Sequence, residues 1–396
     1  MGLLRRLFTT AASIALLAGM VPDRAVADTP EATLEHLLKA EQPAATRFTA
    51  SFLAAVPALE VGRLIAGLRA QFGPLRSIEP KPDGGFLIRL ERAAIPASIT
   101  LDGEGRIAGL WFGAPEIAGE IADHAAAIRA LPGKKALLIL TDGEPVITDS
   151  ADAPLAVGSA AKLAILAALE QAVADGRLAW NKVVPLDPKW KSLPTGQLQD
   201  WPNGSPVTIA TLANLMISIS DNTATDALIA LVGREAVEAL TPANAPFPTT
   251  REFFTLKTDA NAGMREAWKT ADADGRRAIL KQIADAPLPT APSAKATHEV
   301  EWFMTARELC ALLDRTAALP AVSINPGVAD ASRWKRIAFK GGSELGVLNL
   351  STRLVGADGR VHCVVASWND DDALVDEQLM TPYRAILGRL ATSEPE

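Results

Sequence analysis

Cysteine and histidine are scarce in this chain of 396 residues, and their scarcity limits the chemistry open to it. The two cysteines and four histidines are Cys310, Cys363, His36, His124, His298 and His362. None of these side chains stands at the short spacing typical of zinc ligands, so we expect no metal site and no cofactor. Two cysteines can form a disulfide, but their spacing alone does not predict one.

Basic blocks and long apolar runs are also missing from most of the chain. Lys and Arg number 39 against 46 Asp and Glu, a formal net charge of −7, which argues against a nucleic-acid partner. Beyond residue 27 no apolar stretch is long enough to span a bilayer, so we expect no stable membrane insertion of the mature chain. With 48% hydrophobic and 21% charged residues, the composition is that of a globular protein, and the length allows two domains.

Residues 1–27 have the three parts of a signal peptide. Arg5 and Arg6 form the charged start, residues 11–21 are an apolar run, and a small-x-small cleavage site ends at Ala27. We therefore expect an exported protein, periplasmic or secreted. An uncleaved membrane anchor is the alternative, and the paired arginines leave the choice between the Sec and twin-arginine routes open.

Residues 28–129 are predicted to form a small α+β domain. Helical periodicity covers residues 29–71, and short alternating strands separated by Gly-containing turns follow it. These strands are expected at 86–90, 97–101 and 107–112. The order of helices and then an antiparallel meander resembles cystatin-like or steroid-isomerase-like folds. Such a domain could bind a ligand or brace its neighbour, and we favour bracing because no chemical constellation is evident in it.

Residues 130–396 are predicted to form a second domain in which helices cover a sheet, so the expected fold class is mixed α+β and α/β. Strands are expected at 135–141 and 145–148, and again near the end at 337–340, 345–355 and 361–368. Several helices lie between them, and a final helix is expected at 373–390. The sheet is thus expected to be antiparallel and built from both ends of the domain.

The chemistry begins at Ser159 and Lys162, at the start of a helix that is apolar nearly all round. Residues three apart share a helix face, so the amine lies beside the hydroxyl. Burial disfavours a lysine's charge and lowers its pKa, and a neutral amine can take the proton of a serine. Ser-x-x-Lys alone is a weak signal, because Ser332 and Lys335 match it by accident.

Two further motifs follow in order. Ser220-Asp221-Asn222 lies in a short connection between two predicted helices, and Lys340-Gly341-Gly342 lies on a late strand. The separations are 220 − 159 = 61 and 340 − 220 = 120 residues. The ordered set resembles serine β-lactamases and penicillin-binding proteins, with a catalytic domain of the class A type over residues 130–396. The two-domain arrangement most resembles the β-lactamase-like serine hydrolases of clavulanic acid gene clusters.

The resemblance implies a role for each matched residue. Ser159 would be the acylated nucleophile, Lys162 its proton acceptor, and Ser220 the donor of a proton to the leaving group. Asn222 would orient the substrate, and Lys340 would attract a substrate carboxylate. In the Gly342-Ser343 segment, the Ser343 amide would complete an oxyanion hole with the Ser159 amide.

Two positions depart from the pattern. Family members usually carry Thr or Ser directly after the late lysine, and here Gly341 lacks the hydroxyl that would bind a β-lactam carboxylate. Class A enzymes also carry a glutamate as deacylation base, and Glu252 lies 252 − 220 = 32 residues after Ser220, without the Leu-Asn pair that should follow. Glu252 is predicted as this base, with a surface salt bridge as the alternative. Both departures argue against efficient β-lactam hydrolysis.

Three functions stay open at this point. The first is an exported serine hydrolase that cleaves a β-lactam, ester or related amide through an acyl-enzyme. The second is a penicillin-binding-protein-like peptidase acting on peptide-like substrates, and the third is a non-catalytic binder of a β-lactam or cell-wall ligand. A Ser-His-Asp enzyme is disfavoured, since Gly-x-Ser-x-Gly is absent and no histidine lies near Ser159 in the sequence. The sequence does not determine the oligomeric state.

Overall fold

The computed structural model describes residues 29–82, 84–113, 115–288 and 298–391, and the predicted signal peptide lies outside these ranges. The chain divides into two compact units, Met1–Glu116 and Ile117–Glu396, which are described separately below. Among the described residues, no helix combines the length and apolar character needed to cross a bilayer.

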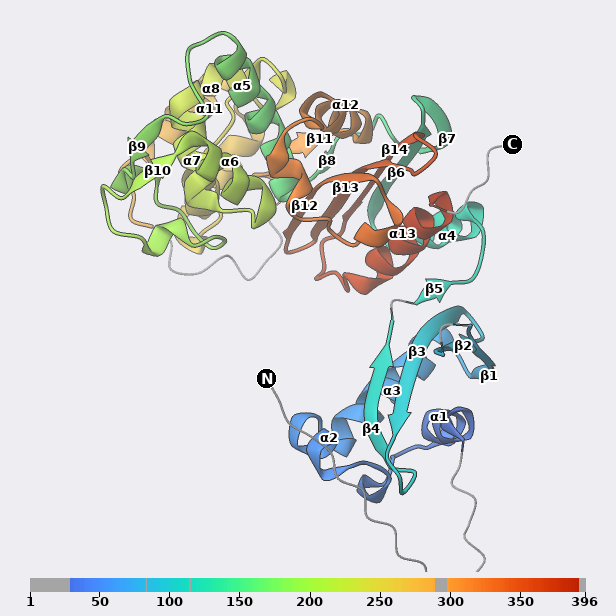
Figure 1. Cartoon of the computed structure of the whole chain (residues 1–396). Coiled ribbons are helices and arrows are strands. Elements are labelled where there is room, and N and C mark those ends of the chain that lie inside the picture. Colours follow the sequence, from blue (N-terminus) through green and yellow to red (C-terminus); the bar gives the residue numbers. More distant parts are fainter. Residues whose placement is uncertain (1–28, 83, 114, 289–297, 392–396) are drawn as a thin grey trace, which may run out of the picture. The chain divides into compact units, whose positions relative to one another are not determined.

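The first unit is the α+β domain expected from the sequence (Figure 1). Its elements are α1 (Pro30–Lys39), η1 (Ala45–Arg47), α2 (Ala50–Ala55), α3 (Ala58–Phe72), β1 (Leu75–Pro80), β2 (Phe86–Leu90), β3 (Ala93–Leu101) and β4 (Ile107–Phe112). Strands β1 to β4 pair in chain order as an antiparallel meander. The core joins apolar residues of the helices, such as Leu34 and Ile65, to alternate strand residues such as Ile88 and Ile95. The helical region predicted over residues 29–71 consists of α1, η1, α2 and α3, and strand β1 was not predicted.

The second unit holds the larger sheet (Figure 1). Its strands run in the order β12 (Arg336–Glu344), β13 (Val347–Val355), β14 (Val361–Asn369), β6 (Lys134–Thr141) and β7 (Glu144–Asp149), and every neighbouring pair is antiparallel. As predicted, the sheet is built from both ends of the domain. β12 is an edge strand, so one side of it is free to face the substrate.

Helices cover both faces of this sheet. Alternation along the strands sends Leu138 and Val365 into one core, with α5 (Lys162–Ala174) and α12 (Ala306–Thr316), and sends Ile139 and Val364 into the other. The second core also holds α4 (Ile121–Arg129) and α13 (Glu377–Leu390). Strands buried on both faces are therefore apolar without interruption, which explains runs such as residues 136–140.

The remaining elements of the second unit connect or cover these layers. They are β8 (Leu155–Ala156), η2 (Gly158–Ala161), β9 (Val183–Pro185), η3 (Pro188–Trp190), η4 (Leu198–Asp200), β10 (Pro206–Thr208), α6 (Ile209–Ser218), α7 (Asn222–Val232), α8 (Arg234–Glu238), η5 (Pro242–Asn244), α9 (Thr250–Leu256), η6 (Asp259–Asn261), α10 (Ala262–Thr270), α11 (Ala273–Gln282), β11 (Phe303–Met304), η7 (Pro320–Ser323) and η8 (Ala331–Arg333). The short strand β5 (Glu116–Ile117) pairs with β3 instead. Of these elements, α9, α10 and α11 follow one another between residues 250 and 282, in the stretch that the sequence described only as holding several helices.

The boundary between the units falls before Ile117, earlier than the predicted boundary between residues 129 and 130. The reason is α4, whose buried residues Ala125 and Ile128 pack in the same core as α13. A helix that follows one domain in the sequence thus contributes its apolar face to the next.

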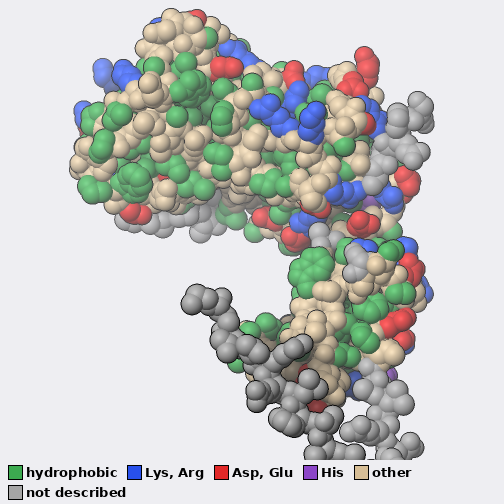
Figure 2. Space-filling model, viewed as in Figure 1, with side chains coloured by type: hydrophobic (Ala, Val, Ile, Leu, Met, Phe, Trp, Pro, Cys, Tyr) green, Lys and Arg blue, Asp and Glu red, His purple; other side chains and the backbone are tan. Residues whose placement is uncertain are grey.

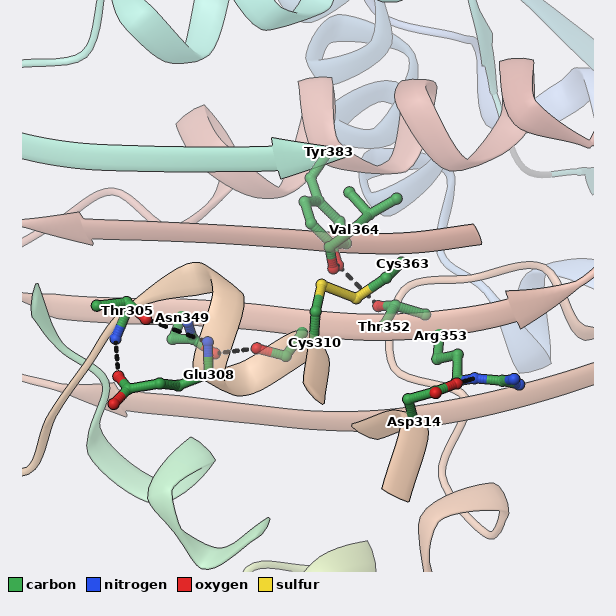
Figure 3. Close-up of a disulfide and its surroundings, with 11 residues drawn as sticks. Thr305, Glu308, Cys310, Asp314, Asn349, Thr352, Arg353, Cys363, Val364 and Tyr383 are labelled. Atoms are coloured by element: carbon green, nitrogen blue, oxygen red, sulfur yellow. Dashed lines mark hydrogen bonds and ion pairs between the residues drawn. A yellow bond between two sulfur atoms is a disulfide. The ribbon is translucent and has the colours of Figure 1, made fainter. Parts of the chain in front are cut away.

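Long-range links hold α12 to the sheet. Cys310 of α12 and Cys363 of β14 form a disulfide, and an ion pair of 2.8 Å joins Asp314 to Arg353 (Figure 3). On the surface that Figure 2 shows, acidic and basic side chains are interspersed with hydrophobic ones.

Candidate active site

Ser159 is presented by a tight turn between β8 and α5. It lies in η2 and is partly exposed, while its neighbours Gly158, Ala160 and Ala161 are buried. Gly158 has φ +48°, a left-handed conformation that glycine adopts without steric cost. The turn therefore anchors itself in the core and leaves the serine side chain accessible, as a nucleophile requires.

Lys162 is fully buried at the first position of α5, among apolar side chains. Its Nζ donates to the Ser220 carbonyl at 2.8 Å, to Ser220 Oγ at 3.0 Å and to Asn222 Oδ1 at 2.7 Å. Burial holds the pKa of Lys162 well below its usual value, and the charge of Lys340 lowers it further. A buried lysine of this kind is available as a proton acceptor.

Ser220 lies in the connection between α6 and α7, with φ +59°. This conformation is uncommon for a residue with a side chain and is maintained only where surrounding contacts impose it. Thr195 Oγ1 provides one such contact by donating to the Ser220 carbonyl at 2.7 Å, and Lys162 provides another. The strained backbone places the Ser220 hydroxyl between the amines of Lys162 and Lys340.

Lys340 approaches Ser220 from the edge strand β12. Its Nζ lies 3.2 Å from Ser220 Oγ and donates to the Gly341 carbonyl at 2.7 Å. Burial lowers the pKa of Lys340 to about 7. Ser220 Oγ thus accepts from both lysines, which leaves its own hydrogen free to be donated elsewhere.

Gly342 allows β12 to approach the nucleophile turn. A Cβ on this residue would lie 2.0 Å from the Val157 carbonyl oxygen and 2.6 Å from the Ser159 amide nitrogen, so only glycine fits. A Cβ on Gly158 would likewise lie 3.3 Å from the Ser343 amide nitrogen. The amides of Ser159 and Ser343 are therefore brought to the same place, as the predicted oxyanion hole requires.

Asp221 and Asn222 follow Ser220, and their side chains hold this segment in place through hydrogen bonds. Asp221 caps α7 by accepting from the Ala224 amide at 2.8 Å, and its other oxygen accepts from the amides of Gln197 and Leu198. This agrees with a structural role for Asp221. Asn222 accepts from Lys162 and donates to the Leu193 carbonyl at 3.0 Å, so it links the lysine to the loop that follows η3.

Glu252 is not brought together with this cluster by any recorded contact. Its carboxylate accepts from Arg234 at 2.8 and 2.9 Å, and it closes a capping box with Thr249 at the start of α9. Arg234 and Glu252 line a separate cavity of about 250 Å³ with Pro246, Arg277, Leu280, Lys281 and Ala284. These contacts match the salt-bridge alternative and provide no support for Glu252 as the deacylation base.

Gly341 and Ser332 are the two positions that the sequence set apart, one for its missing hydroxyl and the other for its accidental match to Ser-x-x-Lys. A Cβ on Gly341 would lie 3.0 Å from Phe339 Cζ and 3.2 Å from the Asn349 carbonyl oxygen, so the aromatic ring fills the space beside this position. Ser332 is exposed, and its hydroxyl bonds Asp330 at the start of η8. Its match to Ser-x-x-Lys therefore has no counterpart in the site.

Two features of the cluster were not foreseen from the sequence. Thr195 lies in a stretch that reads only as a polar surface loop, and no pattern marks it as a partner of Ser220. No hydrogen bond joins the Ser159 hydroxyl to Lys162 among the described residues, although apo enzymes often show such contacts only when substrate is present. The described residues also hold no cluster of three His, Cys, Asp or Glu side chains suited to a metal ion.

Comparison with solved structures finds several that are similar to this chain over about two thirds of its length. Similar solved structures include a β-lactamase from Sphaerobacter thermophilus (21% identity, 68% of this chain and 95% of that chain covered, TM-score 0.49). A β-lactamase from Xanthomonas campestris pv. campestris matches at 18% identity, with the same coverages and a TM-score of 0.47. The structure of PBP-A matches at 15% identity, also with 68% and 95% covered and a TM-score of 0.47.

No curated protein sequence matches the chain. A family model described as the beta-lactamase enzyme family matches residues 124–300, which include Ser159, Lys162 and Ser220. The late motif at Lys340 lies after this range and is brought to the same cluster by the fold. The fold thus joins the three motifs in one buried cluster, and the chain resembles serine β-lactamases and penicillin-binding proteins over the part that the family model matches.

Proposed function

We propose that the protein is an exported hydrolase that cleaves a β-lactam, an ester or a related amide through an acyl-enzyme on Ser159. The observation that carries the proposal is the chain of contacts from Lys162 through Ser220 to Lys340 beside the amides of Ser159 and Ser343. It supplies a proton acceptor, a proton donor and an anion-binding pair around one accessible hydroxyl.

Acylation follows from these contacts. A neutral Lys162 can keep its bonds to the Ser220 carbonyl and Asn222 Oδ1 with its two hydrogens, and its lone pair then takes the Ser159 proton. Ser159 Oγ bonds to the substrate carbonyl carbon, and the carbonyl oxygen becomes an anion held by the two amides. The bond to the leaving nitrogen or oxygen then breaks as Ser220 gives that atom its proton, and Lys162 restores the proton to Ser220.

Lys340 adds a positive charge beside Ser220 when it is protonated. It lowers the cost of negative charge there and attracts a carboxylate on the substrate. The missing hydroxyl at Gly341 removes a second partner for such a carboxylate. We therefore expect neutral esters and amides to be used at least as well as penicillins.

The second candidate is a peptidase of the penicillin-binding-protein type with a long-lived acyl-enzyme. The contacts of Glu252 favour it, because a carboxylate held by Arg234 and the Thr249 amide is not free to activate a water molecule. Asp221 and Asp226 are the carboxylates whose negative charge favours the charged form of Lys162. Both already accept hydrogen bonds from backbone amides, so neither is free to replace Glu252 as the base that activates water. Turnover would then be limited by hydrolysis of the acyl-enzyme.

Export rests on two observations. Residues 1–27 read as a signal peptide, and the Cys310–Cys363 disulfide belongs in an oxidising compartment such as the periplasm or the extracellular space. The expected mature protein begins at Asp28. Measuring the intact mass of the protein recovered from the periplasm or the medium tests this, and a full-length membrane-bound chain would refute it.

The activity is tested by intact-mass measurements over time with a penicillin, a cephalosporin and a simple ester. We expect a covalent adduct on the wild-type chain that disappears as product forms. Ser159→Ala should abolish the adduct, because it removes only the nucleophile, while Ser332→Ala should leave it unchanged. A persistent adduct identifies the peptidase-type alternative, and labelling of Ser159→Ala at the wild-type rate would place the nucleophile elsewhere.

A further inference from the structure

A group of three charges, two of them buried and one partly exposed, lies beside the site and takes no part in the mechanism above. Lys257 follows the last residue of α9, is almost fully buried and lies 4.1 Å from the centre of the Phe253 ring. Its Nζ contacts the carboxylate of Glu301 and lies 2.7 Å from Glu344 Oε2. We call Lys257, Glu301 and Glu344 the Lys257 cluster.

The two glutamates of the cluster stand next to the two amides of the predicted oxyanion hole. Glu344 ends β12 and directly follows Ser343. On the other side, β11 pairs with β8 in the antiparallel register Phe303↔Ala156, and the Val157 amide continues it by bonding the Trp302 carbonyl at 3.0 Å. Glu301 directly precedes Trp302 in the chain, so it lies one residue from the bond to Val157 and is linked through it to the Ser159 turn.

Lys257 therefore connects three chain segments that meet at this point: the end of α9, the end of β12 and the segment that enters β11. The separations in sequence are large, with 44 residues between Lys257 and Glu301 and 87 between Lys257 and Glu344. The contact between β12 and the Ser159 turn is close enough that Gly342 has no room for a Cβ. A small shift of Glu344 along the strand would therefore move the Ser343 amide relative to the Ser159 amide.

Stability alone does not account for such a cluster. Taking three charges out of water is costly, and apolar residues of similar volume are often as stable or more stable. Burial raises the pKa of Glu301 to about 7, and Glu301 Oε2 has no hydrogen-bond partner among the described residues. What the cluster provides is a direction-specific link between the two carboxylates, which apolar side chains would not provide.

We propose that Lys257 is a positioning residue for acylation: by binding Glu301 and Glu344 it fixes the separation of the Ser159 and Ser343 amides. This inference rests on the proposed function and adds a residue to it. The amides stabilise the anionic oxygen only as the transition state forms, so loss of their alignment lowers the rate of acylation and leaves the first, non-covalent binding of substrate little changed.

The test compares Lys257→Met and Lys257→Arg with a matched control, Arg277→Met. Arg277 bonds Glu238 at 2.6 Å, so the control also removes a cation from a partly buried ion pair of the second unit, but away from the site. Two quantities are measured for each variant: the acylation rate constant with its half-saturating ester concentration, and the affinity for phenylboronic acid. The boronic acid forms a tetrahedral adduct with the serine and places an oxygen between the two amides.

We expect Lys257→Met to lose about 10- to 100-fold in the acylation rate and a parallel factor in boronic acid affinity, with half-saturation changed by less than about threefold. Lys257→Arg should recover part of the loss, because it restores a cation that can bind both carboxylates. Arg277→Met should keep the wild-type rate even if its melting temperature falls. If Lys257→Met does not fold, Glu344→Gln is measured instead, and a smaller loss in the same two quantities is expected.

Two results would overturn the inference: a Lys257 or Glu344 variant with unchanged acylation and boronic acid affinity, or an equal loss in Arg277→Met, since the effect would then follow stability rather than position. A wild-type chain that neither labels at Ser159 nor binds the boronic acid refutes the proposed function itself and removes the basis of the inference. The two failures are distinguished by the wild-type measurement alone.

Discussion

The two buried lysines determine the charge of the site at the scale of single residues. Lys162 and Lys340 both contact Ser220 Oγ, and burial lowers the pKa of each. Two cations so close to one hydroxyl also disfavour each other, so at least one of them is neutral over part of the ordinary pH range. The neutral form suits Lys162 as a proton acceptor, while the charged form suits Lys340 as a partner for a carboxylate.

This difference predicts pH profiles that depend on the substrate. For a neutral ester, kcat/KM should rise as Lys162 loses its proton and then level off. For a penicillin, whose carboxylate needs a charged Lys340, kcat/KM should fall again above a pH of about 7, the pKa of Lys340. Measuring both profiles between about pH 5 and pH 10 is the test, with Lys340→Met as the control that should lose the descending limb. Profiles of the same shape for both substrates would contradict it.

At the scale of elements, the contact between β12 and the Ser159 turn depends on one glycine of an adjacent pair. Gly342→Ala should prevent the strand from approaching and lower Ser159 labelling by roughly 100-fold or more, as loss of an oxyanion-hole donor does. The reason is the overlap of a Cβ with the Val157 carbonyl oxygen at 2.0 Å.

Gly341→Ala is the matched control for this prediction. Its Cβ would meet Phe339 Cζ at 3.0 Å and the Asn349 carbonyl oxygen at 3.2 Å. A small shift of the ring relieves the first contact, and a shift of the neighbouring backbone by a few tenths of an ångström relieves the second. Labelling should therefore stay within a few-fold of wild type. Equal losses in the two variants would show that both glycines act through strand stability rather than through the approach to Ser159.

The disulfide is the second feature argued at this scale. It joins α12 to β14 across a sequence separation of 53 residues (Figure 3). Replacing both cysteines by alanine should lower the free energy of unfolding by about 2–4 kcal/mol, because the unfolded chain regains the freedom of a long loop. Urea unfolding of oxidised wild type and of the double variant measures this. The acylation rate at low temperature should be unchanged, and a slower rate would mean that the link also shapes the site.

At the scale of the whole molecule, the chemistry belongs to the second unit. Both apolar cores that surround the sheet lie within residues 117–396, and so do all the residues assigned to the site. The first unit has its own core and its own meander. Its predicted role as a brace, and the resemblance to two-domain hydrolases of clavulanic acid clusters, stay predictions.

A chain that begins at Ile117 tests whether the second unit carries out acylation without the first. We expect it to acylate Ser159 at the wild-type rate per folded molecule, with a lower melting temperature if the first unit braces the second. Intact-mass labelling of both chains measures the acylation rate, and thermal unfolding measures the melting temperature. A folded short chain that no longer acylates would show instead that the first unit contributes to substrate binding, which is the alternative left open by the sequence.

Ser159, Lys162, Ser220 and Lys340 were predicted as one site from the resemblance of three ordered motifs to a known family, and the local context of each motif agreed with that prediction. The local context of each motif depends on neighbouring residues only. Ser159 and Lys162 are three apart on a helix, Asp221 caps the start of a helix, and Lys340 lies on a strand. The order of the motifs along the chain then indicated the family, and the strand pattern indicated a sheet made from both ends of the domain.

The rest required the tertiary structure, because it depends on contacts between segments far apart in the sequence. Glu252 stands at a suitable place in the sequence, yet the fold turns its carboxylate toward Arg234. The Thr195 contact, the pairing of the cysteines, the attachment of α4 to the second unit and the Lys257 cluster leave no local pattern. The local patterns of the sequence determined the secondary structure around each motif, and the resemblance of the ordered motifs to a known family indicated which residues would carry the chemistry. Only packing between distant segments decided what surrounds those residues.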